Sequence, residues 1–88
     1  MLRITRIEDG PHRTALRVEG RVTGSHLGEL ERAIAGCGDD PRRLVVDLAG
    51  VRFVDAPGAA LLSRLRAAGA CLEGCSPFVH ELLQEESR

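Results

Sequence analysis

Residues 44–58, which read LVVDLAGVRFVDAPG, decide the fold. The nearly continuous apolar run over 44–48 is typical of a central strand covered on both faces, or close to it. A turn is expected at 49–50, followed by a short apolar stretch at 51–54. Asp55 comes next, directly before a helical pattern, and is interpreted as the N-cap of that helix.

The stretch after Asp55 carries the most regular apolar spacing in the chain. Apolar residues recur at i, i+1, i+4 and i+7, which predicts a helix whose buried stripe is Leu61, Leu62, Leu65 and Ala68. Gly69 is expected to end this helix. Because Pro57 has no N–H, the Asp55 carboxylate is expected to accept the amide of Gly58, the remaining donor among the second and third helical residues.

The first half of the chain predicts a hairpin and then a helix. The alternating runs 2–7 and 14–19 are typical of strands, with a turn around Gly10 between them, and the first run is expected at a sheet edge. Ser25 is interpreted as the N-cap of the first helix. The apolar face of that helix is expected to consist of Leu27, Leu30 and Ile34.

The end of the chain predicts a short strand over 71–73 and a last helix. Ser76 and Pro77 suit the N-cap and first position of that helix. Its buried stripe is expected to be Phe78, Val79, Leu82 and Leu83. Residues 84–88 are expected to form a solvated tail.

The expected order of elements is β-β-α-β-α-β-α, in a single α/β domain that spans 1–88. Beyond the hairpin, strands alternate with helices, which implies parallel pairing through right-handed crossovers. We therefore expect a four-stranded mixed sheet with three helices mainly on one face.

Composition excludes several classes of function. Twelve basic and thirteen acidic residues nearly cancel, so the chain lacks the basic face that nucleic-acid binding needs. No apolar run approaches the roughly 20 residues that a membrane span requires, and no secretory signal is recognisable. Three cysteines, an odd number, suit a reducing compartment. A cytoplasmic protein without membrane insertion is expected.

Catalytic and metal-binding patterns are equally weak. If 71–75 is extended, the α-carbons of Cys71 and Cys75 lie about 13 Å apart, which disfavours a zinc site with His80. The two thiols are interpreted as small buried side chains, and Cys37 as an exposed thiol in a turn. Asp47 is interpreted as a backbone-bonding residue rather than a phosphoacceptor. We therefore expect no catalytic residue, no cofactor, no metal and no enzymatic activity.

The run VEGRV at 18–22 and the pattern DLxGVxFVDxxG at 47–58 resemble the STAS family, as does the order of elements. This family is shared by anti-sigma-factor antagonists, sulfate transporters and some bacterial lipid-transport complexes. The resemblance covers essentially the whole chain and implies a non-catalytic, protein-binding regulatory module of a bacterial cell. It leaves open a partner that is an anti-sigma factor or kinase-like regulator, a subunit of a lipid-type ABC transporter, a bound nucleotide, and a homodimer.

Two departures from the antagonist pattern concern the loops that such proteins use against their kinase. The antagonists carry a phosphorylated serine directly before the helix glycine, where this chain has Pro57, and an aspartate where it has Thr23. The resemblance therefore implies a binding module without the phosphoswitch. The resemblance implies a partner surface at these loops, and they follow the carboxyl ends of adjacent strands, where open α/β sheets place their binding crevice. Partner contacts are therefore expected at Thr23, Gly24, Ser25, Asp55, Ala56, Pro57, Gly58 and Arg64.

Overall fold

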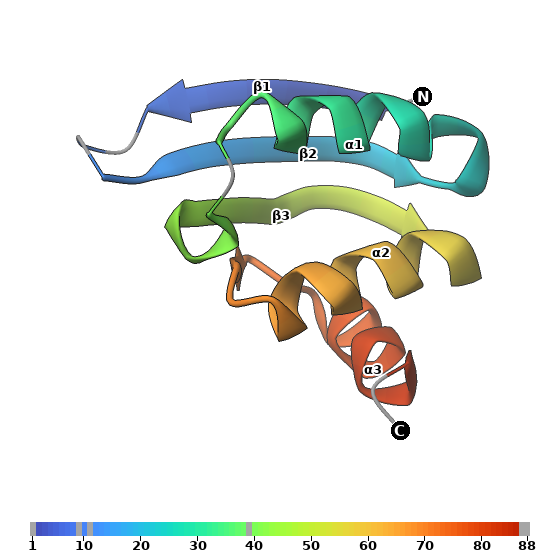
Figure 1. Ribbon diagram of the computed structural model, residues 1–88. Coiled ribbons are helices and arrows are strands. Elements are labelled where there is room, and N and C mark those ends of the chain that lie inside the picture. Colours follow the sequence, from blue (N-terminus) through green and yellow to red (C-terminus); the bar gives the residue numbers. More distant parts are fainter. Residues whose placement is uncertain (1, 9, 11, 39, 87–88) are drawn as a thin grey trace.

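A computed structural model describes residues 2–8, 10, 12–38 and 40–86, which form a sheet with helices packed against it (Figure 1). The elements are β1 (Leu2–Glu8), β2 (Thr14–Val22), α1 (Leu27–Ala35), β3 (Leu44–Val54), α2 (Ala56–Ala67), β4 (Cys71–Glu73) and α3 (Pro77–Glu86). Short 3-10 turns, Gly24–His26 and Pro41–Arg43, precede α1 and β3. The order of strands and helices is the one that the sequence predicted.

The sheet has the strand order β1-β2-β3-β4 and is mixed, as predicted. β1 lies at the edge and pairs antiparallel with β2, so that Ile4 faces Val18. The other two pairings are parallel, and Val46 of β3 lies between Leu16 of β2 and Leu72 of β4. The predicted hairpin and the two parallel crossovers are therefore confirmed.

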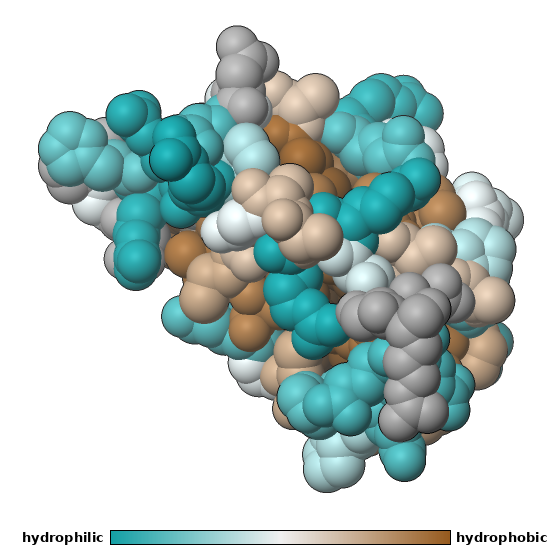
Figure 2. Space-filling view, turned by 60° about the horizontal axis from the view of Figure 1, so that its bottom comes forward, coloured by the Kyte–Doolittle hydropathy of each residue, from teal (hydrophilic) through white to brown (hydrophobic). Residues whose placement is uncertain are grey.

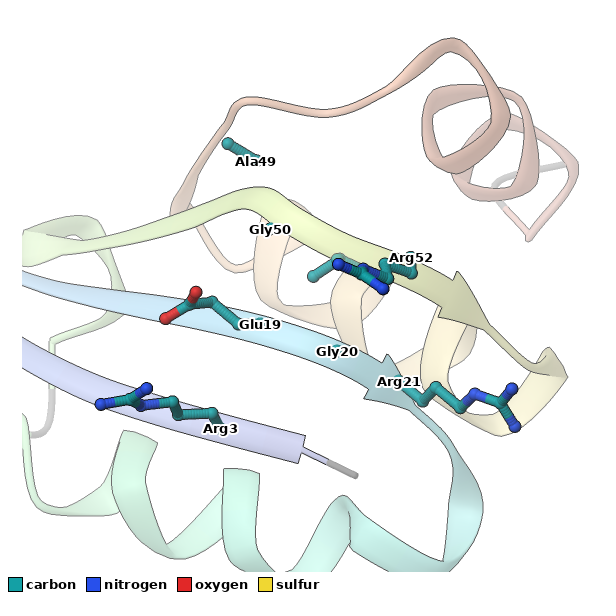
Figure 3. Close-up of a pocket in the computed structure, with 8 residues that line it drawn as sticks. Arg3, Glu19, Gly20, Arg21, Ala49, Gly50 and Arg52 are labelled. Carbon is teal, nitrogen blue, oxygen red and sulfur yellow. The ribbon is translucent and has the colours of Figure 1, made fainter.

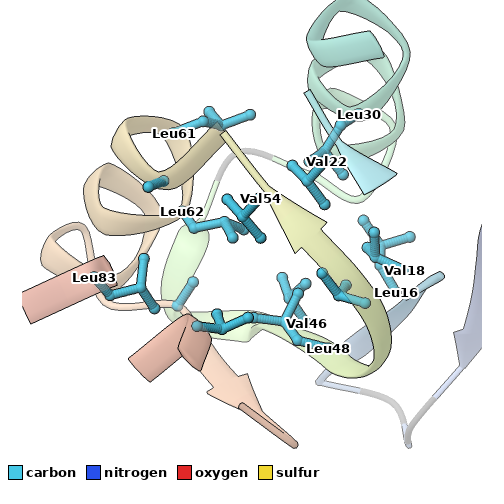
Figure 4. Close-up of a cluster of buried hydrophobic side chains, with 14 of the residues drawn as sticks. Leu16, Val18, Val22, Leu30, Val46, Leu48, Val54, Leu61, Leu62 and Leu83 are labelled. Atoms are coloured by element: carbon cyan, nitrogen blue, oxygen red, sulfur yellow. The ribbon is translucent and has the colours of Figure 1, made fainter. Parts of the chain in front are cut away.

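One face of the sheet carries the core and the three helices. The core joins inward-facing strand residues to one stripe of each helix, and among its members are Leu16, Val18, Val22, Leu30, Val46, Leu48, Val54, Leu61, Leu62 and Leu83 (Figure 4). Two residues of the predicted stripes fall outside this core. Ala68 is exposed after the end of α2, and the Phe78 side chain is 50% exposed at the start of α3. Leu65 is half-buried and packs against the core.

β3 is longer than the predicted strand, because no turn interrupts it at 49–50. Compared with β2, it has one extra residue between Asp47 and Gly50 and another between Val51 and Phe53. These bulges shift the register and let an eleven-residue strand continue through a sequence typical of a turn. The Asp47 carboxylate accepts the N–H of the second residue after it at 3.0 Å, which confirms its backbone-bonding role.

The helix starts are partly as predicted. The Ser76 hydroxyl accepts the N–H of Val79 at 3.2 Å, so the predicted cap of α3 is confirmed. Ser25 is not the cap of α1, because it lies inside the 3-10 turn that the N–H of His26 closes onto the Thr23 carbonyl. The tail predicted over 84–88 is helical through Glu86, and 87–88 lie outside the described residues.

The three cysteines are free thiols, but their exposure differs from the prediction. Cys71 is exposed rather than buried, since β4 turns it to the face of the sheet that the helices leave uncovered. Cys75 and Cys37 are half-buried against the core. Desolvation by burial raises the pKa of both of these thiols, and this effect is opposed by Arg66 near Cys75 and by Arg6 near Cys37.

The surface mixes polar and apolar side chains. Figure 2 shows apolar side chains reaching the visible face in several patches between hydrophilic ones, which is usual for a folded domain. Among the described residues, no helix is long and apolar enough to cross a membrane. The same part of the chain has no group of three or more histidine, cysteine or acidic side chains that could hold a metal ion.

Candidate functional site

The two predicted loops meet at one end of the sheet. The last residues of β2 and β3, Val22 and Val54, are paired neighbours in the parallel ladder. Thr23 therefore leaves the sheet beside Asp55, and the first turn of α2 begins next to the 3-10 turn at Gly24–His26 (Figure 1). This is the end of the sheet at which the sequence analysis expected the partner surface.

Asp55 ties these two loops together with both carboxylate oxygens. Oδ1 accepts the N–H of Gly58 at 2.8 Å, which confirms the predicted cap of α2. Oδ2 accepts the N–H of Gly24, also at 2.8 Å, across 31 positions of sequence. The Asp55 N–H in turn donates to the Val22 carbonyl at 3.1 Å. One side chain thus caps a helix and fixes the neighbouring loop.

Gly58 allows the start of α2 to lie directly on the end of β2. A Cβ atom at this position would collide with the Val22 carbonyl oxygen, and it would lie 3.0 Å from Val22 Cγ1 and 3.1 Å from Asp55 Oδ1. Gly58 is buried, so no side chain could be turned outward to relieve the collision. Close packing at this residue holds the helix start in place.

The outer surface of the site is made of small side chains. Gly24, Ser25, Ala56 and Pro57 are exposed, and Thr23 is half-buried. The Thr23 and Ser25 hydroxyl oxygens lie 3.1 Å apart, within hydrogen-bonding distance. The two loops touch, since a Cβ added at Gly24 would lie 3.7 Å from the Pro57 ring. The seven predicted loop residues therefore lie together, and all of them except the buried Gly58 reach the surface.

Arg64, the eighth predicted residue, lies apart from this surface. It is exposed on α2, seven residues after Pro57 and on the same side of the helix. Two helical turns correspond to about 10 Å along the axis. The structure therefore places Arg64 at the margin of the site.

The arrangement offers contact surface and few reactive groups. Both oxygens of Asp55 already accept backbone amides. Pro57 has no amide to offer an anion, and the amide of Gly58 is taken by the cap. In the described part of the chain, the hydroxyl of Ser25 contacts that of Thr23, and no histidine bonds to either.

A second feature escaped the sequence-based prediction. A hollow of about 600 Å³ lies on the sheet, lined by Arg3, Glu19, Gly20, Arg21, Ala49, Gly50, Val51 and Arg52 (Figure 3). The sequence-based prediction did not include this hollow, because the turn expected at 49–50 separated Arg52 from the central strand. The alternation of charged residues at 17, 19 and 21 was the signal that one face of β2 is open.

The sequence and the fold of this chain are similar to those of known proteins. The family model described as "Mlab, STAS domain" matches residues 5–85. No curated protein matches the chain. A solved structure, the anti-sigma factor antagonist SpoIIAA in its unphosphorylated form, is similar with a TM-score of 0.69 at 12% identity, covering 93% of this chain and 82% of that one. The fold is thus shared, and because the family model covers nearly all of its residues, this chain belongs to the STAS domain family described as Mlab.

Proposed function

We propose that this chain is a non-catalytic, protein-binding regulatory module and that residues 1–88 act as one binding domain. Its partner surface consists of Thr23–Ser25 and Asp55–Gly58, extended by Arg64. The observation that carries this proposal is the pair of 2.8 Å bonds by which Asp55 joins the two loops. A surface that is already ordered before binding loses less conformational entropy when a partner docks.

The proposed partner is another protein in the cytoplasm. Similarity to a solved anti-sigma factor antagonist supports an anti-sigma factor or kinase-like regulator. The second partner class that the family resemblance implies is a subunit of a lipid-type ABC transporter. Three free thiols suit a reducing compartment.

The proposed module has no phosphoswitch in this loop. Pro57 has no hydroxyl that a kinase could phosphorylate, and it removes one amide from the start of α2. The Gly58 amide, which could otherwise help to hold a phosphate, is bonded to Asp55. Partner binding is therefore expected to be independent of ATP.

The test measures the affinity of two purified candidates, an anti-sigma factor and a transporter ATPase subunit encoded in the same genome. Ser25→Arg and Pro57→Glu place bulk and charge on the loop surface, and each should weaken binding of the true partner about tenfold or more. Glu31→Arg, on the exposed side of α1, is the matched control and should change the affinity less than twofold, or about 0.4 kcal/mol. A partner that binds the loop variants as tightly as the wild type would refute the proposed surface.

Pro57→Ser tests the missing switch. The variant should fold with a change of less than about 1 kcal/mol, because serine is acceptable in the first turn of a helix. Incubation of the wild type with ATP and cell lysate should leave partner binding unchanged, and mass spectrometry should find no phosphate on the loops. A phosphate on Ser25 that alters binding would contradict the proposal.

A further inference from the structure

The sheet face opposite the helices carries a row of arginines from three strands. The register pairs Arg3 of β1 with Glu19 of β2, and Glu19 with Gly50 of β3. Arg21, two residues after Glu19, points to the same side of the sheet. Arg52 is the extra residue of the second bulge, and Figure 3 shows its side chain on this face near Gly20.

The hollow between these side chains exists because its floor is nearly bare. Gly20, Ala49 and Gly50 supply little more than backbone there. A Cβ atom at Gly50 would lie 2.7 Å from Cγ of Glu19, so the glycine makes room for Glu19 to lie across it. Figure 3 shows Glu19 on the strand between those of Arg3 and Arg52, with its carboxylate on the side of Arg3, and Arg21 pointing toward the end of the sheet.

The arginines of the hollow lack partners within the described residues. Arg3, Arg21 and Arg52 form no ion pair or hydrogen bond there, whereas Arg17 on the same face pairs with Asp47 at 3.6 Å. Among the described residues that line the hollow, Glu19 is the one carboxylate, which leaves two net positive charges there. Phe53 adds an apolar surface next to Arg21, with a side chain that is 43% exposed.

We propose that this hollow, the arginine groove, binds an extended acidic segment of a partner protein. Carboxylates at positions i and i+2 of an extended chain lie about 7 Å apart, a spacing similar to that of residues two apart in β2. Two such carboxylates match the surplus charge of the groove, and an apolar residue further along would contact Phe53. Arginines and exposed aromatic side chains are the residues that most often dominate binding energy at interfaces.

The central carboxylate decides between ligand types. Glu19 would repel a compact, multiply charged phosphate placed between Arg3 and Arg52. A peptide can distribute its charges on either side of Glu19 and place a neutral residue above it. The groove faces away from the helices, so this inference holds whether or not the loops at Asp55 bind the proposed partner.

The experiment uses the whole chain and a short fluorescein-labelled peptide. Every second residue of the peptide is serine, and the residues between the serines are glutamate, glutamate and leucine, in that order. Arg3→Glu and Arg52→Glu should each weaken binding about fivefold. Glu19→Gln should strengthen it about threefold, an opposite effect that general damage to the fold would not produce. Affinity should fall when NaCl rises from about 50 to 300 mM.

Arg32→Glu is the control, since it makes the same charge change on the exposed side of α1 and should alter peptide affinity less than about twofold. Equal losses for Arg32→Glu and Arg52→Glu would overturn the inference, because binding would then depend on net charge alone. Tighter binding of inorganic phosphate than of the peptide, with the same arginine dependence, would overturn it too. So would equal binding of the peptide with glutamine in place of glutamate.

Discussion

The loops at Asp55 and the arginine groove are built by opposite means. In the loops, the polar groups of Asp55 are satisfied internally, and a buried glycine locks one element onto another. In the groove, Arg3 and Arg52 have no partner among the described residues, and the floor is open. The first surface is defined by shape and the second by charge.

This difference separates stability from recognition. Removing an internally satisfied group leaves its former partners without bonds, which costs folding free energy. Removing an exposed, unpaired charge changes the field that a ligand meets and has little effect on folding. Substitutions of Asp55 or Gly58, which hold the loops together, should therefore lower stability. Substitutions of the groove arginines should change ligand binding and leave folding nearly unchanged.

The largest effect is expected for Gly58→Ala. The added methyl group would collide with the Val22 carbonyl, and moving α2 away from β2 should cost about 3 kcal/mol, measured by urea unfolding. Gly28→Ala is the matched control, since Gly28 is exposed on α1 and the atom nearest to an added Cβ is an arginine nitrogen at 3.8 Å. That change should stabilise the chain by about 0.5 kcal/mol, and equal losses at both glycines would refute the packing argument.

Asp55→Ala and Asp47→Ala compare the loops with the open face of the sheet next to the groove. Asp55 accepts amides from two separate segments, so its loss should cost about 2 kcal/mol. Asp47 accepts one nearby amide and pairs with Arg17, which is half exposed, so its loss should cost about 1 kcal/mol. Chemical unfolding at neutral pH measures both values. A larger loss at Asp47 would show that the open face contributes more to stability than Asp55 does.

Thiol labelling probes the exposure of the open face. Cys71 is exposed there, while burial raises the pKa of Cys37 and Cys75 and so lowers their thiolate fractions near pH 8. Cys71 should therefore react with iodoacetamide about tenfold faster than either, as followed by mass spectrometry of the peptides. Unfolding in urea should make the three rates similar. Equal rates in the folded chain would contradict the burial of the other two thiols.

The smallest effect is expected for folding of the groove variants. Arg52→Glu should change the free energy of unfolding by less than about 0.5 kcal/mol. Arg3→Glu should lower it by less than about 1 kcal/mol, because it places a second glutamate opposite Glu19. Both values are measured on the same samples that are used for peptide binding. A loss above about 2 kcal/mol would show that the arginines support the sheet and would remove the contrast with Gly58.

Most elements could be predicted because their signals are local. The apolar periodicity of Leu27, Leu30 and Ile34 marks the buried side of a helix wherever it packs. A serine followed by proline marks a helix start through a bond that spans three residues. The capping of α2 by Asp55 is equally local, so the bond to Gly58 followed from the sequence.

What the sequence did not predict depends on distant neighbours. The hydrogen bond from the Gly24 N–H to Asp55 joins residues 31 positions apart in the sequence, and no local pattern predicts it. The residues at 49–50 favour a turn by themselves, but in the fold they belong to β3 and lie in a bulge of its pairing with β2. Phe78 has the spacing of a buried residue, yet its side chain is half exposed where α3 begins.

The bulges of β3 also bear on how the chain behaves when it is concentrated. β4 pairs only with positions 45–47, so the outer edge of β3 beyond Asp47 faces no strand among the described residues. A long, flat edge of this kind would be a template for pairing between molecules and for aggregation. Both register shifts fall within this stretch, at 47–50 and 51–53, and a bulge twists a strand and interrupts its regular row of donors and acceptors. The irregularity that builds the floor of the groove therefore also protects the sheet against edge-to-edge growth.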